Sequence, residues 1–199
     1  MGSISSNVRI MMDKDLLVLY QSKKTVFTVN DIALIWNTSK EGFVTKKMYR
    51  YIKSGKMYSP RKGIYTKDLN YDKQELGGRI YTPSYISFET VLAQAGVIFQ
   101  YYSQIFFASY LSREVEIENQ KYVYRKLKDA LLTNPSGTVV KNNLFIATPE
   151  RALLDVLYLN KEYYFDNITN IDWKKVEAIL PVYGGNKRMT LLVERLKHA

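Results

Sequence analysis

Three glutamates that alternate along the chain are the residues best spaced to do chemistry. Glu114, Glu116 and Glu118 precede Lys121. Alternate residues of a strand point to one face, so these carboxylates would lie together, as in nucleases that use metal-bound carboxylates and a lysine. The same alternation is typical of a charged sheet edge, where it prevents edge-to-edge pairing. We favour the edge, because the further carboxylates of such a nuclease site cannot be picked out.

The other residue types offer little for catalysis. The single histidine, His198, stands next to the C-terminus, and the chain has no cysteine. Because a catalytic histidine needs a held geometry and zinc needs several nitrogen or sulfur ligands, we expect no catalytic residue, no metal and no cofactor. A Walker loop and a GxGxxG motif are also missing. Gly184-Gly185 before Lys187-Arg188 could hold an anion at a helix N-terminus, but a plain loop is the simpler interpretation.

Positive charge is concentrated between Val44 and Lys67. The first half of this stretch predicts a helix, because apolar residues recur at helical spacing and basic residues occupy the opposite face. The apolar positions are Val44, Met48, Tyr51 and Ile52. The second half predicts a hairpin of Met57–Ser59 and Ile64–Thr66, with Gly63 supplying positive φ in the turn.

A basic helix followed by a hairpin with a basic tip is typical of the recognition half of a winged helix-turn-helix. Such a helix fits a DNA major groove, and the hairpin tip can reach neighbouring phosphates. The alternative is a half-buried surface helix that is basic without binding DNA. We favour DNA binding because helix, hairpin and charge coincide. The candidate DNA-binding residues are Lys46, Lys47, Arg50, Lys53, Arg61 and Lys62.

The distribution of charge also favours a polyanionic partner. The net charge is +10. Residues 1–75 carry 14 Lys+Arg and 7 Asp+Glu, whereas residues 76–199 carry 15 and 12, so duplex DNA is the expected partner of the first third. The polar N-terminus lacks the apolar segment of a signal peptide, and the apolar runs are too short to cross a bilayer. We therefore expect a cytoplasmic protein with no membrane partner.

The elements before the basic helix complete a small domain. Lys14 to Gln21 predicts a short amphipathic helix. Thr28 and Asp31 form a capping-box pair at the start of a second helix that runs to about Trp36. Because Gly77-Gly78 interrupts a polar segment, we expect the winged helix-turn-helix domain with its linker to span residues 1–78.

Residues 79–199 predict a mixed α/β domain with a largely antiparallel sheet and flanking helices, so the fold class is α+β. Ser87, Thr148 and Asp172 are predicted helix N-caps, and Arg151 and Asp155 are spaced to pair. Four segments rich in β-branched and aromatic residues predict strands: Ile105–Tyr110, Val115–Ile117, Lys121–Leu127 and Thr138–Ala147.

Tyrosine is abundant, with 17 in 199 residues. Tyrosines can fill sheets, anchor protein interfaces or stack on unpaired bases; we favour sheet packing, with an interface second. The most prominent are Tyr101-Tyr102, Tyr163-Tyr164 and, at alternate positions, Tyr122 and Tyr124.

Three segments carry a resemblance to a known family. They are Lys62–Tyr65, the run from Pro83 to Leu92 followed by Gly96, and Ala147–Asp155. In this order they resemble the AbiEi-type antitoxin family of type IV toxin–antitoxin systems, over nearly the whole chain. The Thr-Pro-Glu-Arg-Ala-Leu-Leu-Asp run is the most specific piece, and we interpret it as a mark of the fold rather than as a site.

The resemblance implies two roles. The N-terminal winged helix would repress the operon by binding promoter repeats, and the C-terminal domain would counter a nucleotidyltransferase-type toxin. The chain has no Gly-Ser plus paired-Asp signature of a nucleotidyltransferase, so we expect the antitoxin, which is not an enzyme. The alternative is a nucleic-acid-processing enzyme, a metal-dependent nuclease with a winged-helix targeting domain.

Overall fold

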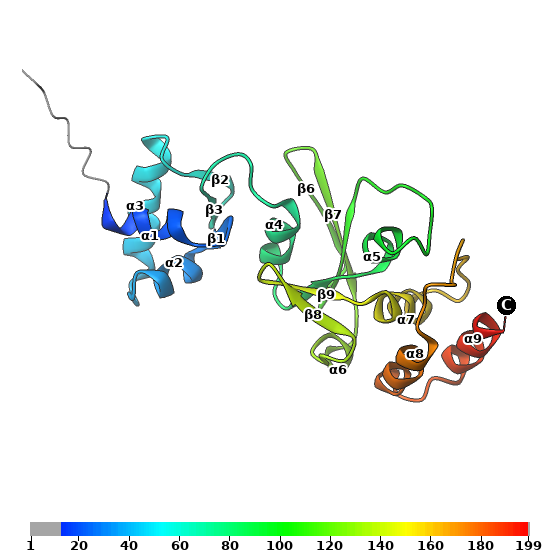
Figure 1. Ribbon diagram of the computed structural model, residues 1–199. Coiled ribbons are helices and arrows are strands. Elements are labelled where there is room, and N and C mark those ends of the chain that lie inside the picture. Colours follow the sequence, from blue (N-terminus) through cyan, green and yellow to red (C-terminus); the bar gives the residue numbers. More distant parts are fainter. Residues whose placement is uncertain (1–12, 199) are drawn as a thin grey trace, which may run out of the picture. The chain divides into compact units, whose positions relative to one another are not determined.

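The chain forms two compact units. The computed structural model describes residues 13–198, and the division falls between Met1–Asn70, here unit 1, and Tyr71–Ala199, here unit 2 (Figure 1). The glycine pair had suggested a boundary at residue 78, but the division lies earlier in the chain. The reason is that the helix that contains both glycines packs on the sheet of unit 2. Within residues 13–198 we find no helix with the length and hydropathy that crossing a bilayer requires.

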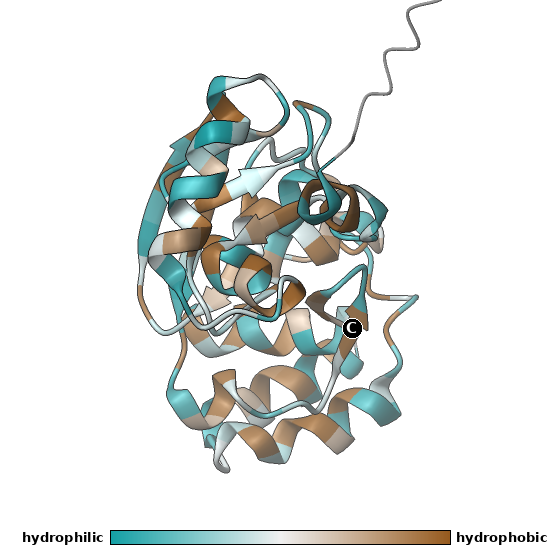
Figure 2. Cartoon of the chain, turned by 90° about the vertical axis from the view of Figure 1, so that its left-hand side faces the viewer, coloured by the Kyte–Doolittle hydropathy of each residue, from teal (hydrophilic) through white to brown (hydrophobic). Residues whose placement is uncertain are grey.

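Over residues 13–70, unit 1 contains three helices and a three-stranded antiparallel sheet of order β1-β3-β2. Its elements are α1 (Lys14–Gln21), β1 (Val26–Thr28), α2 (Val29–Ile35), α3 (Glu41–Lys53), β2 (Tyr58–Arg61) and β3 (Ile64–Thr66). Buried apolar side chains from all three helices and from the strands share one core, which includes Leu19, Phe27, Ile32, Val44 and Met48. In Figure 2 the helices carry hydrophilic and hydrophobic residues side by side, as amphipathic helices do.

Local signals set the ends of these helices. The Thr28 side chain accepts a hydrogen bond from the Asp31 amide (3.1 Å), and the Asp31 carboxylate accepts one from the Thr28 amide (2.9 Å), so the predicted capping box is confirmed. The helix α3 begins at Glu41, ahead of the apolar stripe. It ends where Gly55 takes a left-handed conformation with φ of 68°, as expected.

The hairpin differs from its prediction at the turn. The strand β2 continues through Pro60 and Arg61, so the turn is confined to Lys62 and Gly63, and Gly63 has φ of 80°. The Ser59 hydroxyl donates to the Ile64 carbonyl at 2.9 Å across the hairpin. This bond fixes the tip beyond it.

Unit 2 is built on a six-stranded sheet of order β6-β7-β5-β4-β9-β8. Its strands are β4 (Ser84–Ile86), β5 (Ile105–Ser109), β6 (Arg113–Ile117), β7 (Gln120–Lys126), β8 (Thr138–Lys141) and β9 (Leu144–Ala147). The pairs β5–β7 and β4–β9 are parallel and the other three are antiparallel. The α+β class is confirmed, and the sheet of this unit is mixed.

The helices of unit 2 are α4 (Lys73–Ile80), α5 (Phe88–Gln94), α6 (Asp129–Leu132), α7 (Pro149–Leu159), α8 (Trp173–Ile179) and α9 (Lys187–Lys197), with a 3-10 segment at Leu180–Tyr183. Of these, α4, α5 and α7 pack against the strands of the sheet, whereas α8 and α9 pack on α7. The helix α4 lies so close to the strands that a Cβ at Gly77 would stand 2.5 Å from Phe107 and 2.7 Å from Tyr122. This close approach explains why the glycine pair belongs to a packed helix and not to a linker.

Two features of the sheet differ from the predicted strands. The segment Thr138–Ala147 is a hairpin and not one strand, because Asn142 and Asn143 adopt φ of 51° and 61°, the conformation of a tight hairpin turn. The strand β4 was not predicted, since three residues are too few to show alternation.

Candidate nucleic-acid interface

The helix α3 separates its apolar and basic residues onto different faces. Val44, Met48 and Tyr51 are buried, whereas Lys46, Arg50 and Lys53 are exposed. The spacing of these three cations, four and then three residues, puts them on one side of a helix. The structure thus brings together three of the predicted residues on one exposed surface.

Aromatic side chains lie on the same surface and were missed in the sequence. Tyr49 is 63% exposed and Phe43 is 50% exposed. The sequence could have indicated this, because Phe43 and Tyr49 each stand three residues from Lys46, and residues three apart lie on neighbouring positions of a helix surface. They were overlooked because an aromatic residue in a helix is normally assigned to the core.

The cations of this surface have no internal compensation. The side chains of Lys46, Arg50 and Lys53 form no ion pair with any residue between 13 and 198. Like charges four residues apart on a helix destabilise it by about 0.2–0.5 kcal/mol. Unpaired cations on one side of a helix lower its stability. We expect such an arrangement where an external anion pairs with these cations.

Lys47 does not belong to this surface, although the sequence placed it among the candidates. Its Nζ lies 2.5 Å from Asp15 Oδ2 and 3.1 Å from Asp13 Oδ2, and it sits over the rings of Trp36 and Tyr51 at 5.4 and 5.7 Å. Burial works against the charge, but the hydrogen bonds to Asp15 and Asp13 outweigh it and raise the pKa of Lys47. Lys47 therefore ties α3 to the start of α1, and its ammonium group is engaged within unit 1.

The same contact involves Tyr51 of α3. Its hydroxyl donates to Asp13 Oδ2 at 2.6 Å. This hydrogen bond lowers the pKa of Asp13, with a further contribution from Lys47, while burial raises the pKa of Tyr51 to about 12. The cluster of one lysine, one tyrosine and two carboxylates fixes the position of α3.

Arg61 and Lys62 occupy the exposed tip of the β2–β3 hairpin. The strand behind them is firmly held, because Ile64, Tyr65 and Thr66 are all buried. Neither cation forms an ion pair within the part of the chain that the structure describes. The tip is a fixed point of positive charge, as the sequence predicted.

The acidic residues of unit 1 reinforce this asymmetry. Residues 1–70 carry 13 Lys+Arg and 5 Asp+Glu. Three of these acids, Asp13, Asp15 and Asp31, form ion pairs with Lys47 and Lys24. These three acids are therefore engaged with cations other than Lys46, Arg50, Lys53, Arg61 and Lys62.

The glutamates considered for metal binding do not gather in the structure. Glu114 and Glu116 lie on β6, the edge strand of the sheet, with Glu116 opposite Lys121. Glu118 lies in the turn after that strand and accepts a hydrogen bond from the Tyr71 hydroxyl at 2.6 Å. Among residues 13–198 there is no group of three or more potential ligands able to hold a metal ion. The arrangement favours a charged edge that resists pairing.

The glycine pair near the C-terminus behaves as a plain loop. Gly184 and Gly185 both have positive φ, and Asn186 caps α9. The Arg188 guanidinium donates to the carbonyls of Asn160 (2.6 Å) and Tyr158 (2.9 Å). The Arg188 guanidinium therefore binds carbonyl groups of the protein itself, which favours the plain-loop interpretation.

The Thr148–Asp155 run forms the centre of unit 2. The predicted pair is present, with Arg151 Nε 3.3 Å from Asp155 Oδ1 and both side chains fully buried. The Asp155 carboxylate also accepts hydrogen bonds from the hydroxyls of Tyr85, Ser87 and Tyr183 at 2.7–2.9 Å. Burial raises the pKa of Asp155, and the guanidinium and these hydroxyls oppose that shift.

This network has one consequence that the sequence did not indicate. Because the Ser87 hydroxyl is bound to Asp155, it does not cap α5, and no side chain does. The predicted N-cap marks the right position but its side chain has another role. The Arg151 guanidinium also donates to the carbonyls of Ser136 at 2.8 Å and Leu131 at 2.7 Å, so the run joins several segments of unit 2.

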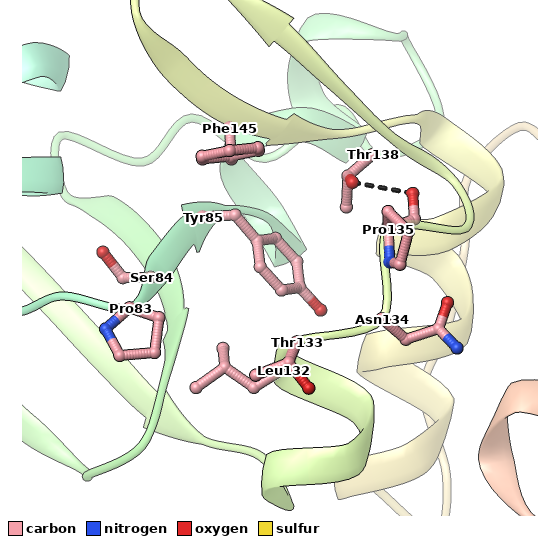
Figure 3. Close-up of a pocket in the computed structure, with 9 residues that line it drawn as sticks. All are labelled: Pro83, Ser84, Tyr85, Leu132, Thr133, Asn134, Pro135, Thr138 and Phe145. Carbon is pink, nitrogen blue, oxygen red and sulfur yellow. Dashed lines mark hydrogen bonds between the residues drawn. The ribbon is translucent and has the colours of Figure 1, made fainter.

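A pocket of about 260 Å³ opens between β4, the β8–β9 hairpin and the segment after α6 (Figure 3). Tyr85 and Phe145 form much of its wall, and the Thr138 hydroxyl donates to the Pro135 carbonyl at 2.8 Å. Its lining includes no Asp, Glu, His, Lys or Arg among residues 13–198. The titratable group of the lining is the Tyr85 hydroxyl, which donates to Asp155 Oδ2 at 2.9 Å and accepts from the Arg151 guanidinium at 3.0 Å.

No protein-family model matches this sequence, and no curated protein matches it.

Proposed function

We propose that the chain binds duplex DNA through unit 1. The proposed contact surface, here called the basic face, consists of Lys46, Arg50, Lys53, Arg61 and Lys62. The observation that carries the proposal is that these exposed cations lack ion-pair partners between residues 13 and 198, while nearby acids are engaged with other lysines.

The arrangement of unit 1 supports a winged helix-turn-helix mode of binding. Helix α3 follows α2 after a short turn, and the β2–β3 hairpin follows α3 directly. In this mode α3 enters the major groove. Arg50 is the candidate for reading a guanine edge, since an arginine can donate two hydrogen bonds to it. Arg61 and Lys62 contact phosphates and set the register.

From the resemblance to AbiEi-type antitoxins we further propose a transcriptional autorepressor and antitoxin. It would bind promoter repeats of its own operon in the cytoplasm and counter a nucleotidyltransferase toxin encoded beside it. The positive and negative charges of unit 2 are nearly balanced. This supports separate roles for the two units, in which unit 1 binds DNA and unit 2 counters the toxin without binding DNA. No observation favours the nuclease alternative, since Glu118 leaves the strand that carries Glu114 and Glu116.

A double substitution separates the two roles. Lys46→Ala with Arg50→Ala changes two exposed positions, so the fold should lose little stability. We expect loss of operator binding in a gel shift and loss of promoter repression in a reporter assay, with growth rescue from the toxin retained at matched expression. Lys141→Ala with Lys174→Ala removes the same charge from exposed positions of unit 2 and is the control.

Two results would contradict the proposal. Unchanged DNA binding by the double variant would remove the basic face from the contact. Loss of toxin rescue in a folded variant would show that neutralisation depends on the basic face. Incubating the protein with DNA or RNA and magnesium or manganese tests the alternative, because metal-dependent cleavage abolished by Glu116→Ala would establish a nuclease.

A further inference from the structure

Two loops of unit 2 form a pocket walled by tyrosines. One loop joins α5 to β5 and the other joins α7 to α8. The pocket has a volume of about 320 Å³, and we call it the tyrosine pocket. Its lining residues are Ile98, Gln100, Tyr102, Tyr163, Tyr164 and Asp166. Sheet packing was the wrong prediction for these tyrosines, which lie outside every strand, although Tyr122 and Tyr124 are buried in β7 as expected.

Hydrogen bonds hold the two loops together without any partner. The amides of Asp166 and Asn167 donate to the Val97 carbonyl at 3.0 and 3.1 Å. In return, the Phe99 amide donates to Asp166 Oδ2 at 2.7 Å. The tyrosine pocket is thus preformed, which lowers the entropy that a ligand must lose on binding.

The same loops expose aromatic side chains to an unusual degree. Phe99 is 71% exposed, Tyr101 is 87% exposed and Tyr164 is 81% exposed. Aromatic residues are enriched at protein interfaces, where their large surfaces become buried. Their concentration around a preformed pocket indicates contact with a macromolecule rather than with a small ion alone.

The chemistry of the pocket selects a cation. Asp166 is the one acidic residue in its lining, which includes no Lys or Arg, and the faces of aromatic rings are electronegative. Within residues 13–198, none of the cation–ring contacts involves Tyr102, Tyr163 or Tyr164. Arg125, whose charge reaches Tyr163, is paired with Glu89 at 2.9 Å. A phosphate would meet Asp166, so stacking of nucleic-acid bases is disfavoured.

We infer that the tyrosine pocket receives a basic side chain of a protein partner, with arginine preferred. A planar guanidinium can stack on a tyrosine ring while its N–H groups donate to a carboxylate. Phe99 and Tyr101 would then cover the partner's surface around that side chain. The inference is independent of DNA binding, because every residue involved belongs to unit 2.

The full-length protein can be tested with a small probe. The probe is N-acetyl-arginine amide, and its uncharged match is N-acetyl-citrulline amide. We expect the arginine probe to shift the backbone amide NMR signals of residues 97–104 and 161–167 in a saturable way. Because the charge supplies the cation–π and carboxylate contacts, citrulline should bind at least about fivefold more weakly.

Substitutions identify the groups responsible. Tyr164→Ala and Asp166→Asn should each weaken the arginine probe several-fold, whereas Tyr164→Phe should retain binding because the ring is kept. Asparagine keeps an oxygen that can accept the Phe99 amide, so the loop should stay in place. Leu191→Ala, at an apolar position on α9 that is 71% exposed, is the control and should change nothing.

Four outcomes would overturn the inference, the last of them in the variants. The first is the absence of shifts in these loops, and the second is equal binding of arginine and citrulline. The third is a single-stranded oligothymidylate shifting the same amides more strongly than arginine does, which would assign the tyrosines to base stacking. Retained binding in both Tyr164→Ala and Asp166→Asn would place the probe elsewhere.

Discussion

The hairpin tip gives the sharpest test of the basic face. Replacing Arg61 and Lys62 by alanine removes two exposed cations that form no ion pair among residues 13–198. Both side chains are exposed, so their removal leaves no cavity in the core. The free energy of unfolding should therefore change by less than about 0.5 kcal/mol, and any change in DNA affinity should come from lost phosphate contacts.

The expected effect follows from counterion release. Each neutralised phosphate contributes about −0.9 to the slope of log affinity against log salt concentration. If the four cations other than Arg50, which is assigned to a base edge, contact phosphates, the slope is about −3.6, and removing two contacts brings it to about −1.8. Between about 50 and 200 mM salt, affinity should then fall about 150-fold for the wild type and about 12-fold for the variant.

Fluorescence anisotropy with labelled duplexes measures this slope. Promoter DNA and a scrambled duplex of equal length are titrated at several salt concentrations. Because phosphate contacts carry no sequence information, the variant should lose affinity for both duplexes alike. An unchanged slope in the folded variant would refute the assignment of the hairpin to the contact surface, and a loss confined to the promoter duplex would show base readout instead.

Three further predictions concern single side chains. Lys47→Ala should leave the salt slope unchanged and lower the free energy of unfolding by about 1–2 kcal/mol, measured by urea denaturation, because its partly exposed ion pairs and ring contacts are structural. Tyr51→Phe should raise the lowered pKa of Asp13, measured by carboxyl NMR titration. Asp13 contributes folding stability that is fully present above its pKa in the unfolded chain and is lost as pH falls through its pKa in the folded protein. The variant should therefore lose this stability at a higher pH than the wild type. Arg151→Met should cost about 3–5 kcal/mol by leaving a buried carboxylate uncompensated, whereas adding Asp155→Asn removes that charge, keeps an oxygen that can accept from the neighbouring hydroxyls and should recover part of the loss; equal stability of both variants would contradict this.

The sequence by itself determined the features that depend on neighbours within one turn. The capping box of Thr28 and Asp31, the left-handed glycines at positions 55 and 63, and the spacing of Arg151 and Asp155 were all predicted and are all present. Each arises from groups at most four residues apart, whose geometry is fixed once the local element forms. The α+β class followed from the same local periodicities.

Tertiary structure decided which of these residues are free to act. Lys47 donates hydrogen bonds to carboxylates more than thirty residues away in the sequence. The Ser87 hydroxyl donates to Asp155, 68 residues away. Likewise, Glu118 left the strand at a turn, and two tyrosine pairs became loop residues instead of sheet core. Composition and spacing name the residue types, but a side chain's partners depend on which distant segment packs against it. That packing is set by burial of the whole core, and so it could not be read from any one stretch of the chain.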